Sequence, residues 1–247
     1  DSKNNAYFTD IGREHVGRID AKTGEITMFA TPTKDSGPRR AMMDDQDRLW
    51  FGEYRANAIA MFDTKSTEFK EWKLPLGWSN PYDVTVDKNG HAWTGSMLND
   101  RISRLDPKTG AVKEWPIPVV SPERNKGVLD VQFDADENVW VGNGFQKAIQ
   151  MFDRKTETFK TYPMAPEFDG DQTELLFLAP KNYKVDGKVW VKNSDGSQIM
   201  RFDPKTEQWE NLGAFSNPAD GKRFGIYGIR ADAQNNLYLL DFQTSNI

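Results

Sequence analysis

Aromatic residues recur along the chain at intervals of 43 to 50 residues, and the positions around them follow one pattern of apolar and polar types. Five of the six positions that lie six residues before an aromatic residue hold Asp, and all six positions nine residues after hold Val or Ile. Repetition at this period along the whole chain is typical of a repeat protein. The six aromatic residues are Tyr7, Trp50, Trp93, Trp140, Trp190 and Tyr238.

Within one period the pattern predicts four short strands, called a to d in chain order. The clearest unit predicts strands at 82–86, 91–96, 102–105 and 112–115, separated by turn segments rich in Asp, Asn and Gly. A second Asp opens the turn between strands c and d in the first five units. These residues are Asp20, Asp63, Asp106, Asp153 and Asp203.

Four strands per period predict an all-β fold, a β-propeller of four-stranded blades. A sandwich or barrel is the alternative, but those folds do not repeat their turn chemistry. We expect residues 1–247 to form a single propeller domain that starts at an a–b turn and stops at the first residue of a strand c. The chain then holds about five and a half blades of a ring of six or seven, and further sequence or another chain closes it.

Composition limits the chemistry. The chain has 32 Lys+Arg and 37 Asp+Glu, a net charge of −5, with no basic stripe, which argues against a nucleic-acid partner. The absence of Cys excludes disulfides, a thiolate nucleophile, Cys-ligated zinc and covalently attached haem within this chain. The longest apolar run, 175–180, is too short for a transmembrane segment.

Two sets of positions are expected at one face of the propeller, here called the top face, where strand a begins and strand b ends. Eleven residues before the aromatic positions stand Arg39, Tyr82, Leu129 and Tyr227. Three residues after them stand Asp10, Glu53, Ser96, Asn143, Asn193 and Asp241. We predict ligand binding by the Arg, Tyr, Ser and Asn residues. The carboxylates Asp10, Glu53 and Asp241 are candidate ligands for Mg²⁺ or Ca²⁺, and a hydrated structural channel is the alternative.

Three other residues are candidates by position. Trp78 lies on a connection from strand d to the next strand a, so it is either an exposed aromatic contact of the top face or a wedge packed between blades. His91 directly follows an a–b turn and is expected to cap it, whereas His15 is expected at the surface. No G-x-S-x-G or H-E-x-x-H motif occurs.

Several segments resemble the virginiamycin B lyase (streptogramin lyase) propeller family. They are Pro81-Tyr82-Asp83-Val84, Leu49-Trp50-Phe51-Gly52-Glu53, Val16-Gly17-Arg18-Ile19-Asp20 and Ile102-Ser103-Arg104-Leu105-Asp106-Pro107-Lys108-Thr109-Gly110. The resemblance implies a propeller, commonly seven-bladed, and in the lyase a Mg²⁺-assisted elimination that linearises a cyclic depsipeptide. It also implies histidines at the start of strand a, where this chain has none, and a glutamate at the top of strand b. Glu53 matches that glutamate and is the one candidate catalytic residue.

The resemblance extends to propellers of bacterial envelope proteins that are fused to a c-type cytochrome domain. The matching segments are Lys192-Asn193-Ser194-Asp195 and Asn235-Asn236-Leu237-Tyr238. This branch implies a periplasmic or secreted setting, and a small molecule or protein as the partner of the top face. We therefore predict a non-catalytic binding or docking module of a larger envelope protein. The alternative is a Mg²⁺-dependent lyase of a cyclic depsipeptide or related ester, with its general base in sequence outside this chain.

Overall fold

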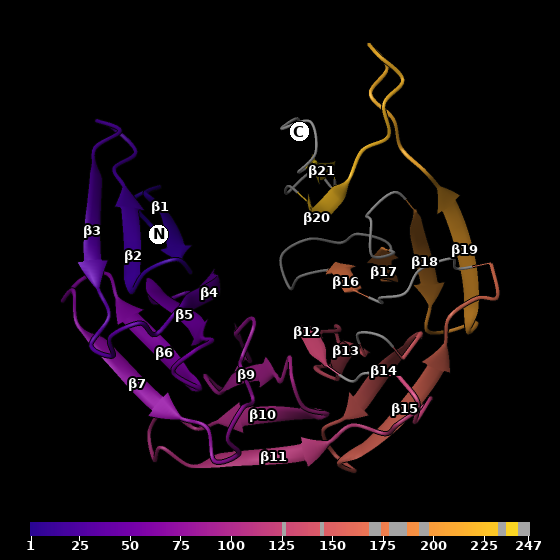
Figure 1. Ribbon diagram of the computed structural model, residues 1–247, viewed down its shortest axis with the longest axis horizontal. Helices are drawn as coiled ribbons and strands as arrows, with labels where there is room; N and C mark the ends of the chain where they lie inside the picture. Colours follow the sequence, from indigo (N-terminus) through magenta and orange to yellow (C-terminus); the bar gives the residue numbers. More distant parts are fainter. Residues whose placement is uncertain are drawn as a thin grey trace. The chain divides into compact units, whose positions relative to one another are not determined.

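Every regular element in the described part of the protein is a β-strand. The computed structural model describes residues 1–124, 127–143, 146–167, 174–177, 187–192, 198–231 and 236–241 (Figure 1). The chain divides into two compact units, Asp1–Ile117 and Pro118–Ile247. No helix in the described residues is long and apolar enough to cross a membrane.

The first unit contains three antiparallel sheets, of three, four and four strands, in which strands adjacent in the chain are also adjacent in the sheet. Its first sheet holds strands b to d of one sequence repeat, and each of the other two sheets holds strands a to d of a repeat. The strands are β1 (Ala6–Asp10), β2 (His15–Ile19) and β3 (Ile26–Ala30); β4 (Pro38–Met43), β5 (Arg48–Glu53), β6 (Ala58–Asp63) and β7 (Phe69–Lys73); β8 (Thr85–Val86), β9 (Ala92–Gly95), β10 (Arg101–Leu105) and β11 (Val112–Pro116).

The second unit contains two four-stranded sheets and a two-stranded sheet, with the same sequential order. The strands are β12 (Val128–Phe133), β13 (Val139–Asn143), β14 (Ala148–Asp153) and β15 (Thr158–Pro163); β16 (Glu174–Phe177), β17 (Val189–Lys192), β18 (Ile199–Asp203) and β19 (Gln208–Gly213); β20 (Ile226–Ala231) and β21 (Leu237–Asp241). The predicted four-strand repeat is therefore confirmed, with six strands of type b among the described residues and five of each other type.

The aspartate that precedes each aromatic residue organises the a–b turn. In the second sheet, Oδ1 of Asp44 accepts hydrogen bonds from the backbone N–H groups of Gln46 and Arg48, and Oδ2 accepts one from the Trp50 indole at 2.8 Å. The same aspartate-to-aromatic bond joins Asp87 to Trp93, Asp134 to Trp140 and Asp1 to Tyr7. One side chain therefore closes a turn and pairs a buried indole N–H.

The core lies between neighbouring sheets. Trp50 and Phe51 are consecutive in β5 and point to opposite faces, and both are fully buried. Phe51 packs toward the first sheet and Trp50 toward the third, so one sheet supplies two core layers.

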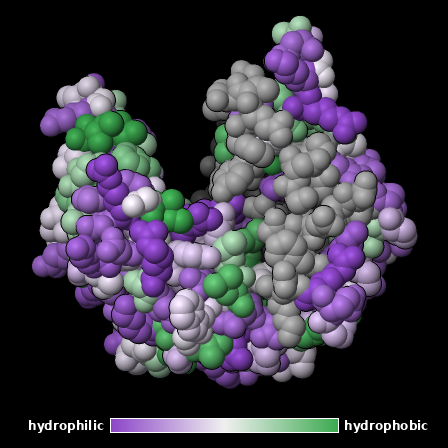
Figure 2. Space-filling view, viewed as in Figure 1, coloured by the Kyte–Doolittle hydropathy of each residue, from purple (hydrophilic) through white to green (hydrophobic). Residues whose placement is uncertain are grey.

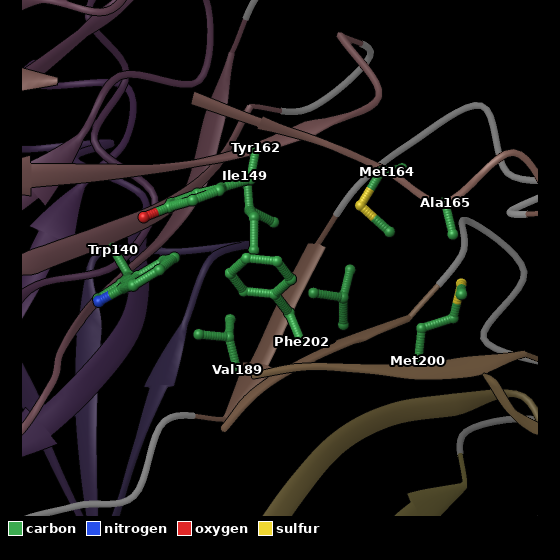
Figure 3. Close-up of a cluster of buried hydrophobic side chains, with 9 residues drawn as sticks. Trp140, Ile149, Tyr162, Met164, Ala165, Val189, Met200 and Phe202 are labelled. Atoms are coloured by element: carbon green, nitrogen blue, oxygen red, sulfur yellow. The ribbon is translucent and has the colours of Figure 1, made fainter. Parts of the chain in front are cut away.

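Figure 3 shows the equivalent layer in the second unit, where Trp140, Ile149 and Tyr162 meet Val189 and Phe202. Tyr238, the last of the six repeated aromatic residues, is 46% exposed. The structure describes two strands of its sheet, β20 and β21. The surface seen in Figure 2 is mainly hydrophilic, with separate hydrophobic patches.

Candidate functional site

The strands of type a, the first strand of each repeat, are irregular near their first residues. Pro38 of β4 pairs with Glu53, but Ala41 pairs with Phe51, so the register of β4 against β5 shifts by one residue. Equivalent shifts occur in β12, β16 and β20. A bulge re-aims side chains and is common beside binding and catalytic sites. The residues between the shifted pairs are Arg39 and Arg40, Leu129 and Asp130, Leu176, and Tyr227.

The first strand of the third sheet is also irregular, but it is shortened rather than bulged. Strand a was expected over 82–86, but β8 contains only Thr85 and Val86. Upstream of it, Pro81 forms an isolated bridge to Ser96. Proline lacks the N–H that a regular ladder needs, and the three residues between Pro81 and β8 are left outside the ladder. Tyr82 is therefore held at the entrance of its strand, as Arg39 is in β4.

Arg39 and Tyr82, the two strand-a candidates of the first unit, lie together. The Arg39 guanidinium carbon is 3.9 Å from the centre of the Tyr82 ring and 5.7 Å from that of Tyr54. The Arg40 guanidinium approaches the same Tyr82 ring at 4.8 Å. Cation–π contacts of this kind contribute about 0.5–2 kcal/mol each. The ring of Tyr82 is buried, whereas both arginines are partly exposed, so the aromatic ring is a fixed support for the charged groups.

Glu53 lies in a different environment. Its side chain is fully buried, and it points to the same face of the second sheet as Phe51 and Glu71. Glu71 and the Ser36 hydroxyl are its polar neighbours, but neither carboxylate oxygen of Glu53 is in hydrogen-bonding geometry with them. Burial, and then the charge of Glu71, raise the pKa of Glu53 to about 8.

Glu71 is itself held by the connection between β3 and β4. Its carboxylate accepts hydrogen bonds from the backbone N–H of Thr33 at 2.9 Å and from the Thr33 hydroxyl at 2.6 Å. In the same connection the Thr31 and Ser36 hydroxyls pair at 2.8 Å. Glu53 is therefore enclosed beneath this connection.

The three predicted metal-ligating carboxylates each have their own surroundings. Asp10 is partly exposed and accepts a hydrogen bond from the N–H of Gly12, and buried Asp241 accepts one from the N–H of Gly225. Among the described residues, no three acidic or histidine side chains group in a way that could hold a metal ion. The described side chains therefore supply no ligand set for Mg²⁺ or Ca²⁺, and the binding of these ions stays a prediction.

Trp78 is 79% exposed, so the alternative of a wedge between blades is wrong. It has a φ of 62°, a left-handed conformation that is uncommon for a bulky residue. Its carbonyl accepts a hydrogen bond from the Asn99 side chain at 2.9 Å, and the following residue, Ser79, donates its N–H to the Asn57 side chain at 2.7 Å. The predicted site residue Ser96 belongs to this loop, because its hydroxyl donates to the Ser79 carbonyl.

The remaining candidates belong to the second unit. Asn193 lies outside the described residues, and at Asn143 and Tyr227 only the backbone is described. Leu129, the strand-a residue of β12, is buried and apolar.

Neither histidine lies at a strand-a position. His91 closes the a–b turn: its N–H donates to Asp87 Oδ1 at 3.0 Å, and its Nδ1 lies 3.3 Å from Asp87 Oδ2. This confirms the expected capping role. His15 is the first residue of β2 and pairs with Asp10 and Ala30.

Comparison with known proteins decides the family. Residues 1–167 match the virginiamycin B lyase family. This chain belongs to that family. No curated protein matches it.

Solved structures of virginiamycin B lyases share the propeller fold. A streptogramin B lyase is similar with a TM-score of 0.78 and 20% identity, over 97% of this chain and 73% of that one. A catalytically inactive histidine-to-alanine variant of virginiamycin B lyase from Staphylococcus aureus with Quinupristin is similar with a TM-score of 0.80 and 20% identity, over 99% and 76%. The extracellular domain of a protein described as a one-component system of B. thetaiotaomicron has a TM-score of 0.69 and 17% identity, over 95% and 30%. The predicted β-propeller is confirmed.

Sequence reasoning missed three side chains of the site. Arg40 lies in the same bulge as Arg39, Tyr54 follows the repeated Glu53 position, and Glu71 faces Glu53 from strand d. The signal for Arg40 was its place directly after Arg39, in the Arg-Arg pair that follows Pro38. Nothing in the repeat pattern pointed to Glu71.

Proposed function

We propose that this protein is a ligand-binding member of the virginiamycin B lyase family that does not linearise streptogramins. The observation that carries the proposal is the set of residues at the entrances of the innermost strands. Arg39, Tyr82, Leu129 and Tyr227 stand there, and the only two histidines of the chain lie elsewhere. In the S. aureus relative, a variant in which one histidine is changed to alanine is catalytically inactive. The entrances of β4 and β8 present the side chains of Arg39, Arg40 and Tyr82, cationic and aromatic groups that suit binding.

The proposed setting is the bacterial envelope or the extracellular space, where the propeller serves as a binding or docking module of a larger protein. One similar structure is an extracellular domain, and this chain spans 30% of its length, so this type of propeller occurs as part of a longer chain. A small molecule or a protein is the proposed partner of the top face.

A Mg²⁺-dependent lyase of a cyclic depsipeptide or related ester is the second candidate. The raised pKa of Glu53, to about 8, supports it, because catalytic acids commonly have raised pKa values. The position of Glu53 opposes it, because the carboxyl group is fully buried beneath the β3–β4 connection and lacks a path to a ligand in this arrangement. The lyase would also need a general base from sequence outside this chain.

One assay separates the two candidates. Quinupristin is incubated with the full chain, with Mg²⁺ or with EDTA, and the cyclic and linear forms are separated by chromatography, with the S. aureus enzyme as the positive control. We expect no linear product above the protein-free blank. Mg²⁺-dependent product that disappears in Glu53→Ala but persists in Glu25→Ala, a change at an exposed glutamate, would overturn the proposal and establish the lyase.

A further inference from the structure

Arg39 combines features that point to a specific ligand chemistry. The bulge in β4 places two consecutive guanidinium groups, those of Arg39 and Arg40, against the single ring of Tyr82. Of these two guanidinium groups, that of Arg39 has aromatic rings as its only described contacts.

The Arg39 guanidinium has no hydrogen-bond partner among the described residues. Its described interactions are the rings of Tyr82 and Tyr54, and none of the described carboxylates forms an ion pair with it. Its Nε is buried without a hydrogen-bond partner, although the residue as a whole is partly exposed. Buried N–H donors are normally paired. An unpaired donor on a partly exposed arginine therefore indicates a place where a ligand with a hydrogen-bond acceptor binds. Arg40 has other interactions, and the assignment therefore concerns Arg39 alone.

The planar shape of the guanidinium also determines which anions fit. Its carbon lies 3.9 Å from the centre of the Tyr82 ring, and the N–H donors of a guanidinium all lie in its plane, at its edges. Two parallel N–H groups at such an edge match two oxygens of one anion in a bidentate pair. Chloride or a neutral amide offers no such pair of acceptors.

We infer that Arg39, stacked on Tyr82 at the bulged entrance of β4, binds a carboxylate or phosphate group of the ligand of this propeller. This inference rests on the proposed function, because it names the ligand chemistry of the same site. Arg39 makes the bidentate pair, and its contact with the buried Tyr82 ring restrains the side chain, so that less rotamer entropy is lost on binding.

The experiment follows the Nε–H resonance of Arg39 by NMR on the full chain, since a buried Nε–H exchanges slowly with water. The resonance is assigned by its loss in Arg39→Lys. The probes are sodium benzoate, inorganic phosphate and, as the neutral analogue of benzoate, benzamide. We expect a saturable shift with benzoate or with phosphate and none with benzamide. The anion that binds with the higher affinity shows whether the ligand supplies a carboxylate or a phosphate group.

Variants provide the quantitative test, with backbone amides near Tyr82 as the readout. Arg39→Gln should weaken binding of the preferred anion by about tenfold or more, and Arg39→Lys, which keeps the charge but not the fork, by several-fold. Arg13→Gln, at an exposed arginine, should leave the affinity unchanged. Equal affinities of Arg39→Gln and the unchanged protein, or equal shifts with benzoate and benzamide, would overturn the inference. A spectrum with native dispersion shows that each variant is folded. Lyase turnover would defeat the proposed function but not this inference, and absent anion binding would defeat this inference alone.

Discussion

The indole nitrogen of Trp50 donates a hydrogen bond of 2.8 Å to the carboxylate of Asp44, six residues earlier in the chain. The same carboxylate accepts hydrogen bonds from the side chain of Arg48 and from two backbone N–H groups of the a–b turn. Burial tends to raise the pKa of Asp44, but the hydrogen bonds from Arg48 and Trp50 outweigh it and hold the pKa below its usual value. The pair therefore links the closure of a turn to the placement of the largest core side chain of the sheet.

Replacing Asp44 with Ala should lower the free energy of unfolding by about 2–4 kcal/mol, because a buried indole N–H and two turn N–H groups lose their acceptor. The measurement is urea denaturation at pH 7. Since the pKa of Asp44 is lowered in the folded state, its contribution is present above the unfolded pKa and is lost as pH falls through the folded pKa. The difference between Asp44→Ala and the unchanged protein should accordingly shrink as pH falls below the unfolded pKa near 3.8.

Asp63→Ala is the matched control, because Asp63 opens the c–d turn of the same sheet and accepts two backbone N–H groups but no indole. We expect a cost of about 1 kcal/mol. Equal costs for the two variants would show that the bond to Trp50 contributes nothing.

The repeat was predictable because its physical causes are local. Asp44 and Trp50 are six residues apart, and the turn that joins them uses only the residues between them. The local sequence pattern therefore contains every residue that forms the turn and its hydrogen bond. The four-strand units and the order of strands within each sheet followed from the same periodicity.

The arrangement of the site was less predictable because its contacts join different sheets. Arg39 meets Tyr82, 43 residues later, and the bulge that directs Arg39 there leaves no mark in the alternation of apolar and polar residues. Glu53 was placed correctly at the end of strand b, but its complete burial depends on the β3–β4 connection, through Glu71 and Thr33. Periodicity gives a residue its strand and face, whereas burial depends on what another segment places over it.

The raised pKa of Glu53 predicts an unusual pH dependence of stability. Its folded pKa of about 8 exceeds the unfolded value near 4.5, so the folded state favours the protonated carboxyl group. The stability that this group contributes is complete below the unfolded pKa and is lost as pH rises through 8. The free energy of unfolding should fall between pH 5 and 8 by up to about 1.4 kcal/mol per pH unit.

Glu53→Gln should remove this slope, because the amide cannot ionise, and should stabilise the protein at pH 8 relative to the unchanged chain. Urea denaturation at several pH values from 5 to 9 measures both effects. Glu25→Gln, at an exposed position, should keep the slope. If the slope persists in Glu53→Gln, another group causes it.

Gly52 tests how closely neighbouring sheets approach beside the site. A Cβ atom at Gly52 would lie 2.5 Å from the Pro81 carbonyl oxygen, which belongs to the backbone that leads to Tyr82. Backbone cannot move aside as a side-chain tip can, so Gly52→Ala should destabilise the protein by about 2–3 kcal/mol. Gly77→Ala is the control, because nothing lies within 4 Å of a Cβ at that position. A thermal or urea denaturation in which both variants behave alike would mean that the two sheets can separate at Pro81 without cost.

The c–d turns offer a change that should stabilise the protein. In each of these turns the residue four positions after the opening Asp adopts a positive φ: Gly24 at 72° and Gly110 at 76°, but Thr67 at 62°. A β-branched residue is strained in this conformation, so Thr67→Gly should raise the free energy of unfolding by about 0.5–1 kcal/mol, despite the greater flexibility of glycine in the unfolded chain. The reverse change, Gly24→Thr, should lower it by about 1–2 kcal/mol, and it does so without a steric clash, since no atom lies within 4 Å of a Cβ at Gly24. Urea denaturation of the two variants should therefore give shifts of opposite sign. Shifts of the same sign would mean that the left-handed conformation does not limit the stability of these turns.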